Sequence, residues 1–539
     1  MGKIYKIPSK NSFLDSLVAG YLNYQKDGCN NLIILPSNID IKLTKQIFSK
    51  YLDKAIILPK FTTLNDYLSL DDPFVIFTEY LNFPVEMPID EFKLEIYNFL
   101  LRWQKTKTYQ QKYASFKLNK NDFIHRFTNF FLQIEEHLLN PEDIIRLKPD
   151  NLPIAEELIF SFLAFFTTKW FKYQKSKNIV TVTEKQNLIL KFKTKFLAKL
   201  QKYDNIILAG TTGVNPLTMD FINAVSKHPQ GVFIYHEKHE ESAILNQINP
   251  NLLIDKLIQN INGTNIKLWT EQTTAQRYIQ EFIGKNLYEE AEFIAKELAS
   301  STEKQIILTN NQELRDLILF KTNKYINSLN FNLNNYQKIF KLFYNLQGNY
   351  DQQQLEEYFA CYFPNHKNLI SQNINVINCT KKLILEHLVK IIPAEYHHEL
   401  TKLKHIISKI TVKNINNKQY LELLKLISPD RNSIYYEDSE LMIIQPKELR
   451  LINFEKIICA DLNQNSWQSK FDKIFNLKNI KKNLINLENI RNIQIASDFL
   501  RLSNCKNIIF TRAKNNHNKE NLAYIFYQHF IKHHNISSL

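Results

Sequence analysis

Short runs of apolar residues alternate with segments of helical periodicity along much of the chain. The runs are rich in isoleucine and leucine, and most of them lack the alternation of polar and apolar positions that marks a strand with one solvated face. Such runs are typical of strands in a parallel sheet that helices cover on both faces. The sequence therefore predicts buried strands at residues 31–36, 55–59, 204–210, 231–236, 304–309, 454–462 and 504–513.

Two long segments interrupt this alternation. Residues 61–199 carry apolar side chains at helical spacing, as in FIHRFTNFFLQIEEHLL, and residues 321–429 are rich in Asn, Lys and Leu with a mostly helical pattern. We interpret both segments as helical insertions. The predicted fold class is α/β, with two parallel-sheet domains. The first would comprise residues 1–60 and 200–240, the second residues 285–320 and 430–515, and a C-terminal helix or tail would follow at 516–539.

The composition is typical of a globular protein, with 44% hydrophobic and 23% charged residues. Its five cysteines are far apart and include no CxxC pair, which favours neither a disulfide framework nor a zinc cluster. The sequence begins without the apolar stretch of a signal peptide, and its longest uncharged apolar run, Leu158 to Thr168, is shorter than the roughly 20 residues of a membrane helix. We therefore expect a cytoplasmic protein with no membrane partner.

The formal net charge of +14 allows two interpretations. A basic surface favours a polyanionic partner, because Lys and Arg side chains that neutralise phosphates release condensed counterions. Alternatively, the many Lys, Asn and Ile residues reflect AT-rich codons. The charge is locally concentrated, since residues 470–514 contain ten basic and three acidic side chains. This concentration favours a basic surface.

The sequence lacks the residues that a P-loop needs. In GxxxxGK[ST] the glycines let backbone N–H groups wrap a phosphate, and the lysine reaches its oxygens. The closest glycine pair, Gly210 and Gly213, is followed by Val214, and the loop after the 31–36 run begins Ser37-Asn38. We therefore predict no nucleotide cofactor and no catalytic residue.

Two other motifs each have a structural and a functional interpretation. AGTTGVNP at 209–216 is either a ligand-binding loop at the carboxyl edge of a sheet or a turn in which Asn215 caps the next helix. His529 and His533 have the spacing of two metal ligands on one helical face, but no third ligand is suggested. We interpret these histidines as a solvated helix face and predict no metal.

Five segments in collinear order resemble the alphaproteobacterial AddB family. The strongest is YDNIILAGTTGVNPLTMDFINAVSKHPQGVFI at 203–234, where a strand ending in AGTTG leads to a helix, a PQG turn and another strand. The others are IPSKNSFLDSLVAGYL with NLIILPS near the start, EEAEFIAKEL at 289–298, PKELRLINFEKIICADLNQNSWQ at 446–468, and IRNIQIASDFLRLSNCKNIIFTRAK at 490–514.

The resemblance implies two helicase-like domains in a subunit that works with AddA, an ATP-driven helicase–nuclease, in double-strand break repair and recombination. The chain departs from the family where Asn38-Ile39 replace a basic pair and where Asp461 begins a stretch without the Gly and Glu of the GLNEG motif. It also looks shortened, without the nuclease domain. Matching positions are Glu448, Arg450, Trp467, Arg491, Asp498, Phe499, Thr511, Arg512, Ala513 and Lys514.

We therefore expect a non-catalytic DNA-binding scaffold subunit with an AddA-like partner. The alternatives are a degenerate remnant or protein-interaction scaffold that does not bind DNA, and an active helicase or nuclease subunit. DNA would run across the carboxyl edges of both sheets, with Trp467 stacking on a base and Arg512 contacting phosphate. Trp467 could instead pack between the two sheet domains, and Arg512 could form a salt bridge to a nearby acidic residue. The expected contacts are Ser37, Asn38, Thr211, Thr212, Trp467, Arg491, Thr511, Arg512 and Lys514.

Overall fold

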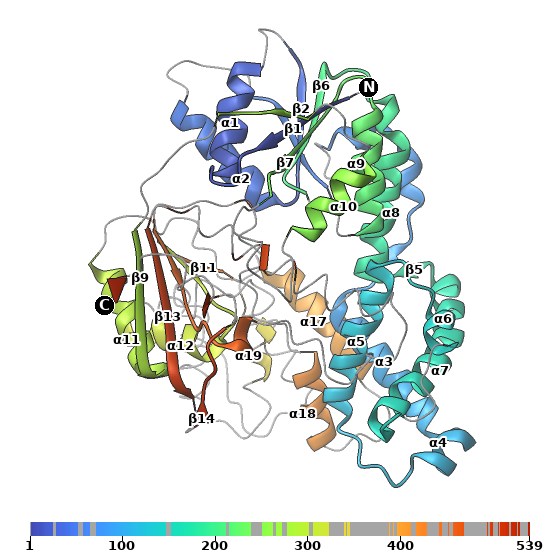
Figure 1. Ribbon diagram of the computed structural model, residues 1–539. Helices are drawn as coiled ribbons and strands as arrows, with labels where there is room; N and C mark the ends of the chain where they lie inside the picture. The colour runs from blue at the N-terminus through green and yellow to red at the C-terminus, as the bar shows by residue number, and fades with distance from the viewer. Residues whose placement is uncertain are drawn as a thin grey trace.

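The computed structural model contains two parallel sheets and a body of helices beside them (Figure 1). Among the residues it describes, no helix is both long and apolar enough to span a membrane. It describes residues 2–24, 29–51, 58–64, 72–146, 152–211, 215–238, 251–261, 266–271, 278–300, 305–322, 396–410, 417–427, 441–444, 456–467, 507–516 and 519–524, and single residues or pairs and triples between 339 and 538.

The first sheet has six strands in the order β3-β2-β6-β7-β1-β8, all paired in parallel. Every residue of β2 is buried, because helices cover both faces. The strands are β1 (Lys3–Ile7), β2 (Asn31–Leu35), β3 (Lys60–Thr63), β6 (Asn205–Ala209), β7 (Gly231–His236) and β8 (Ile266–Leu268). The helices between them are α1 (Phe13–Tyr24), α2 (Asn38–Tyr51), α9 (Pro216–Lys227) and α10 (Leu252–Asn260).

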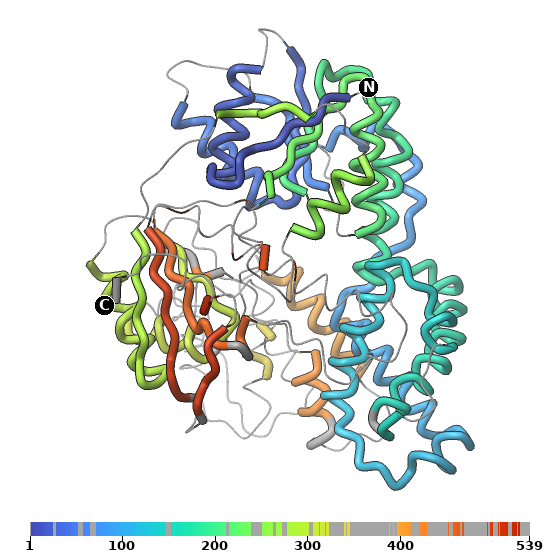
Figure 2. Tube along the Cα trace, in the orientation of Figure 1, coloured from blue at the N-terminus to red at the C-terminus, as the bar shows by residue number. Residues whose placement is uncertain are grey.

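The second sheet has the order β11-β10-β12-β13-β9-β15, also parallel, with β14 added antiparallel to the end of β13. In Figure 2 the strand near residue 510 lies beside the strand near residue 280. The strands are β9 (Tyr278–Asn286), β10 (Gln305–Leu308), β11 (Leu441–Ile444), β12 (Lys456–Cys459), β13 (Asn507–Asn516), β14 (Lys519–Glu520) and β15 (Ser537–Ser538). The helices are α11 (Leu287–Ala299), α12 (Gln312–Lys321) and α19 (Gln464–Trp467).

The two sheets share one strand order. If the parallel strands are counted along the chain within each sheet, both read third, second, fourth, fifth, first, sixth. In both sheets, the chain passes from the second strand to the third in one direction across the sheet, and from the fourth strand to the fifth in the opposite direction. The carboxyl ends of these two strands form a topological switch point, where open α/β sheets bind their ligands. The switch points are at β2 and β6 in the first sheet and at β10 and β12 in the second.

Most helices of the two insertions form a single body around one hydrophobic core. Buried residues of α3, α5 and α7 belong to the same cluster as those of α17 and α18, and Asn121 donates a hydrogen bond to the Glu422 carbonyl over 3.0 Å. The short β4 (Val85–Glu86) and β5 (Ile179–Val180) pair beside them. The helices are α3 (Ile89–Gln104), α4 (Lys107–Lys112), α5 (Lys120–Glu136), α6 (Pro141–Arg146), α7 (Ile154–Lys177), α8 (Val182–Phe196), α17 (His397–Ile410) and α18 (Asn417–Leu426), with 3-10 turns at Pro73–Ile76, Thr78–Asn82 and Leu197–Lys199. Helix α8 connects the body to the first sheet, because its buried Leu190, Phe192 and Phe196 belong to the hydrophobic cluster of that sheet.

The predicted α/β class with parallel sheets is confirmed, and several details differ. Strand β1 was missed because KIYKI contains two lysines and no continuous apolar run, and β9 because YIQEFIGKN mixes polar with apolar residues. The first sheet also extends past residue 240 to β8, and the 516–539 segment contributes the short strands β14 and β15. The predicted 55–59 strand lies largely outside the described residues, and β3 follows it.

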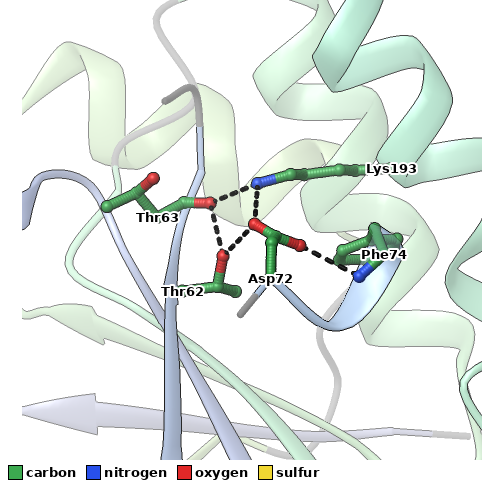
Figure 3. Close-up of polar contacts among 5 residues, drawn as sticks. All are labelled: Thr62, Thr63, Asp72, Phe74 and Lys193. Atoms are coloured by element: carbon green, nitrogen blue, oxygen red, sulfur yellow. Dashed lines mark hydrogen bonds and ion pairs between the residues drawn. The ribbon is translucent and has the colours of Figure 1, made fainter. Parts of the chain in front are cut away.

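A buried ion pair attaches α8 of the helical body to β3 at the edge of the first sheet (Figure 3). The Lys193 ammonium donates to the Asp72 carboxylate over 3.1 Å and to the Thr63 carbonyl over 2.7 Å. Asp72 also accepts from the Thr62 hydroxyl over 2.6 Å and from the Phe74 amide over 2.9 Å. Both side chains are at most 4% exposed, so each charge depends on its partner.

We expect Lys193→Met to lower the free energy of unfolding by about 3–5 kcal/mol, because it leaves the Asp72 carboxylate buried without its counter-charge. Urea unfolding of the full chain measures this loss. Lys195→Met, on the exposed side of the same helix, is the matched control and should change stability by about 0.5 kcal/mol or less. Equal losses in the two variants would contradict a structural role for the pair.

Candidate functional site at the carboxyl edges of the two sheets

At the first-sheet switch point, Ser37, one of the expected contact residues, makes hydrogen bonds within its own loop. The Ser37 hydroxyl donates to the Asp40 carboxylate over 2.6 Å and accepts from the Asp40 amide over 3.3 Å at the start of α2. Asn38 is exposed, and Thr211 is buried. Asn215 caps α9 by accepting from the Leu217 amide over 2.8 Å, as the turn interpretation expected.

Gly210 directly follows β6 and has a left-handed backbone conformation, with φ of 78°. A Cβ at this position would also overlap the side chain of Leu451, a residue that precedes β12 of the second sheet. Glycine is required here for two reasons, since a side chain would strain the backbone and displace Leu451. Leu451 is 3% exposed and belongs to the hydrophobic cluster of the first sheet.

At the second-sheet switch point, a buried carboxyl group joins two strand ends. Glu290 of α11 is fully buried, and its Oε1 accepts hydrogen bonds from the Thr511 hydroxyl and the Asp461 amide, each over 2.7 Å. Its Oε2 has no hydrogen-bond partner among the described residues. Thr511, predicted as a phosphate contact, is 1% exposed and instead holds Glu290 to β13.

Asp461 connects this carboxyl group to the neighbouring strand. It follows β12 with φ of 52°, a left-handed conformation that aspartate tolerates better than most residues, at the position where the AddB motif has glycine. Its carboxylate accepts from the Asn311 side-chain amide over 2.9 Å, and from Ser466 and Asn463. Asn311 follows β10, so its bond to Asp461 bridges the two strands of the switch point.

The pKa of Glu290 is raised to about 8, mainly by burial and to a smaller extent by the neighbouring Asp461 carboxylate. The hydrogen bonds from Thr511 and from the Asp461 amide, and the Arg512 charge, act in the opposite direction. Glu290 is therefore mostly protonated near neutral pH. Sequence reasoning missed this residue, although it lies in the EEAEFIAKEL segment, because only the fold places α11 beside the ends of β12 and β13.

Trp467 packs within the hydrophobic cluster of the second sheet, neither on an exposed edge nor between the two domains as the alternative had it. It is 1% exposed, its indole N–H donates to the Ala460 carbonyl over 3.0 Å, and its ring contacts Phe499 and Tyr524. A base cannot stack on a ring that is enclosed in this way. Trp467 therefore does not offer the predicted stacking surface for DNA, because the core of the second sheet encloses both faces of its indole ring.

Arg512 and Lys514 lie on the same face of β13, where the strand approaches its end. Arg512 is partly buried and donates to the Asn521 carbonyl over 3.4 Å, and the described residues show no salt bridge to it. Its charge acts on Glu281 of β9 and lowers the pKa of that carboxyl group, while burial raises it more. Lys514 is exposed. The strand register places Lys285 of β9, whose side chain is 85% exposed, beside Lys514.

The two switch points do not form one continuous edge. Leu451 precedes β12 and lies on Gly210 of the first sheet, whereas Asp461 follows β12. The end of β13, where β14 pairs with it, lies on the side of the second sheet that faces away from the first sheet (Figure 1). From the sequence we predicted that DNA would run across the carboxyl edges of both sheets. The relative placement of the two sheets separates these edges.

Other predicted positions fall outside the described residues, namely Thr212, Arg491, Glu448, Arg450 and Asp498. Within the part of the chain that the structure describes, no group of three or more His, Cys, Asp or Glu side chains could hold a metal ion.

No protein-family model matches the sequence, and no curated protein matches it at a significant level. The AddB resemblance therefore rests on the motifs of the sequence itself, and what it implies about activity and partners belongs to a proposal.

We expect the free energy of unfolding to fall as the pH rises from about 4.5 to about 8, because folded Glu290 retains a proton that the unfolded chain loses. The raised pKa lowers the free energy of unfolding by at most about 5 kcal/mol over this pH range, because each pKa unit corresponds to about 1.4 kcal/mol. Glu290→Gln should match the parent at about pH 4 and below, where Glu290 is protonated in both the folded and the unfolded chain, and gain relative stability toward about pH 9. Urea unfolding across this pH range measures the slope.

Glu135 of α5 is the matched control for this prediction. Burial also raises its pKa to about 8, and it accepts a hydrogen bond from Thr181 in the helical body. Glu135→Gln should remove a separate part of the slope, and the double variant should remove both. A Glu290→Gln variant that keeps the full slope of the parent would contradict the assignment of a protonated Glu290.

Proposed function

We propose that this chain is a non-catalytic scaffold subunit that binds DNA and acts with an ATP-driven, AddA-like motor in double-strand break repair and recombination. The observation that carries the proposal is the pair of parallel sheets with one strand order, in which the protein's own side chains occupy both switch points. Leu451 lies at one, and the Asn311–Asp461 hydrogen bond bridges the other. This arrangement suits a scaffold that keeps a two-sheet architecture without using its ligand positions.

The basic surface supports the DNA-binding part of the proposal. Lys285 and Lys514 lie on adjacent strands with both side chains exposed, and Arg512 lies on the same face of β13. Exposed cations at this spacing can contact successive phosphates without reading bases. The enclosed Trp467 and Thr511 take no part, so binding would depend on charge rather than on stacking.

A protein-interaction scaffold without DNA binding is the second candidate. The burial of Trp467 and Thr511 favours it, because it removes a stacking platform and a hydroxyl donor from the expected interface. The two candidates differ in one measurable property, since only phosphate contacts make affinity fall linearly with the logarithm of salt concentration.

Charge reversal at the exposed lysines tests the DNA surface. We expect Lys285→Glu with Lys514→Glu to weaken single-strand binding by more than tenfold, about 1.4 kcal/mol, and to reduce the salt slope by about 1.4. Filter binding across a salt series measures both quantities. Lys42→Glu with Lys45→Glu, exposed on α2 of the first sheet, is the matched control and should change affinity much less. Equal losses of affinity in the two double variants would indicate that DNA responds to the overall positive charge and not to this surface. Weak binding by the parent that does not depend on salt would favour the protein-interaction scaffold.

Co-purification tests the motor partner. We expect the tagged full chain to retain an AddA-like helicase–nuclease and to show no ATP turnover by itself. The complex should turn over ATP in the presence of DNA ends. ATP turnover by the chain alone, lost on substitution of one of its own residues, would contradict the scaffold and favour an active helicase subunit.

A further inference from the structure

The two sheets exchange hydrophobic side chains across their boundary. Leu451, which comes just before β12 of the second sheet, packs in the cluster of the first sheet with Leu35 and Ala209. In the opposite direction, Ile39 and Leu43 of α2 pack against the cluster of the second sheet. Each sheet thus completes part of its core with residues of the other.

The Leu451 contact is located at the first-sheet switch point. Its methyl groups lie against the Gly210 backbone, directly after the carboxyl end of β6, and Thr211 beside it is 9% exposed. A ligand at this position would need the space that Leu451 occupies. Because close-packed interiors leave few voids, the leucine and a ligand cannot be present together.

We infer that Leu451 closes the first-sheet switch point and thereby locks the two sheets in one relative arrangement, so that this edge becomes accessible only when Leu451 is withdrawn. This contact is a conformational device independent of the proposed DNA binding, which involves the far end of β13. Two features of Gly210 support it. Its lack of a Cβ leaves the space in which Leu451 lies against the backbone, and its positive φ disfavours any side chain at this position.

Hydrogen exchange of the full chain tests this inference. Leu451→Ala removes the methyl groups that cover Gly210, and we expect amide exchange in residues 205–211 to become at least tenfold faster under native conditions. The Gly210 amide, which donates to the Ile234 carbonyl over 3.1 Å, reports on the edge directly. Leu308→Ala is the matched control, because Leu308 is fully buried within the second sheet's own cluster. It should speed exchange in 305–308 and leave 205–211 unchanged.

Two further variants keep the test decisive if Leu451→Ala does not fold. Leu451→Val shortens the side chain more mildly and should give the same pattern with a smaller rise. Gly210→Ala adds a methyl group instead of removing methyl groups, yet it should also displace Leu451 and speed exchange in 205–211. If exchange in 205–211 stays at the parental rate in the variants that fold, or rises equally throughout the chain, the inference is wrong.

Discussion

Parallel pairing of short apolar strands is the constraint on which the rest of this structure depends. The central strands β2, β6 and β12 each have both faces covered, so their backbone groups can be satisfied only by neighbouring strands. Parallel neighbours require a crossover, and the crossover helices supply the two covering layers. The same strand order in both sheets then determines which loops meet at each carboxyl edge. Both switch points follow from that order.

The helical body depends on the sheets for its assembly. Its two parts are inserted at different places, one between the third and fourth strands of the first sheet and the other between the second and third strands of the second. The aromatic side chains of α3, α5 and α7 and the aliphatic ones of α17 and α18 share one core, so neither insertion buries its apolar face alone. The buried Lys193–Asp72 pair then fixes α8 of this body to the edge of the first sheet.

Buried polar groups specify the arrangement at the second carboxyl edge. Glu290 accepts from the backbone after β12 and from a hydroxyl on β13, and Asn311 joins the end of β10 to Asp461. Hydrogen bonds of this kind allow one geometry, whereas apolar packing tolerates several. At the first edge the corresponding position is apolar, with Leu451 against Gly210. The two sheets therefore close equivalent positions by different chemistry.

The sequence by itself determined the strands that are continuously apolar and the helical character of α3, α5 and α7, because burial on both faces or along one helical stripe leaves a local pattern. It also placed Thr511 and Arg512 on a strand, although β13 continues to Asn516 and both residues lie inside it and not at its end. Only the tertiary structure decided that Trp467 and Thr511 are enclosed, that Glu290 lies beside Asp461, and that Leu451 reaches Gly210. These contacts join residues far apart in the chain, and their side chains meet only after strand order and sheet packing are set, which no local pattern encodes.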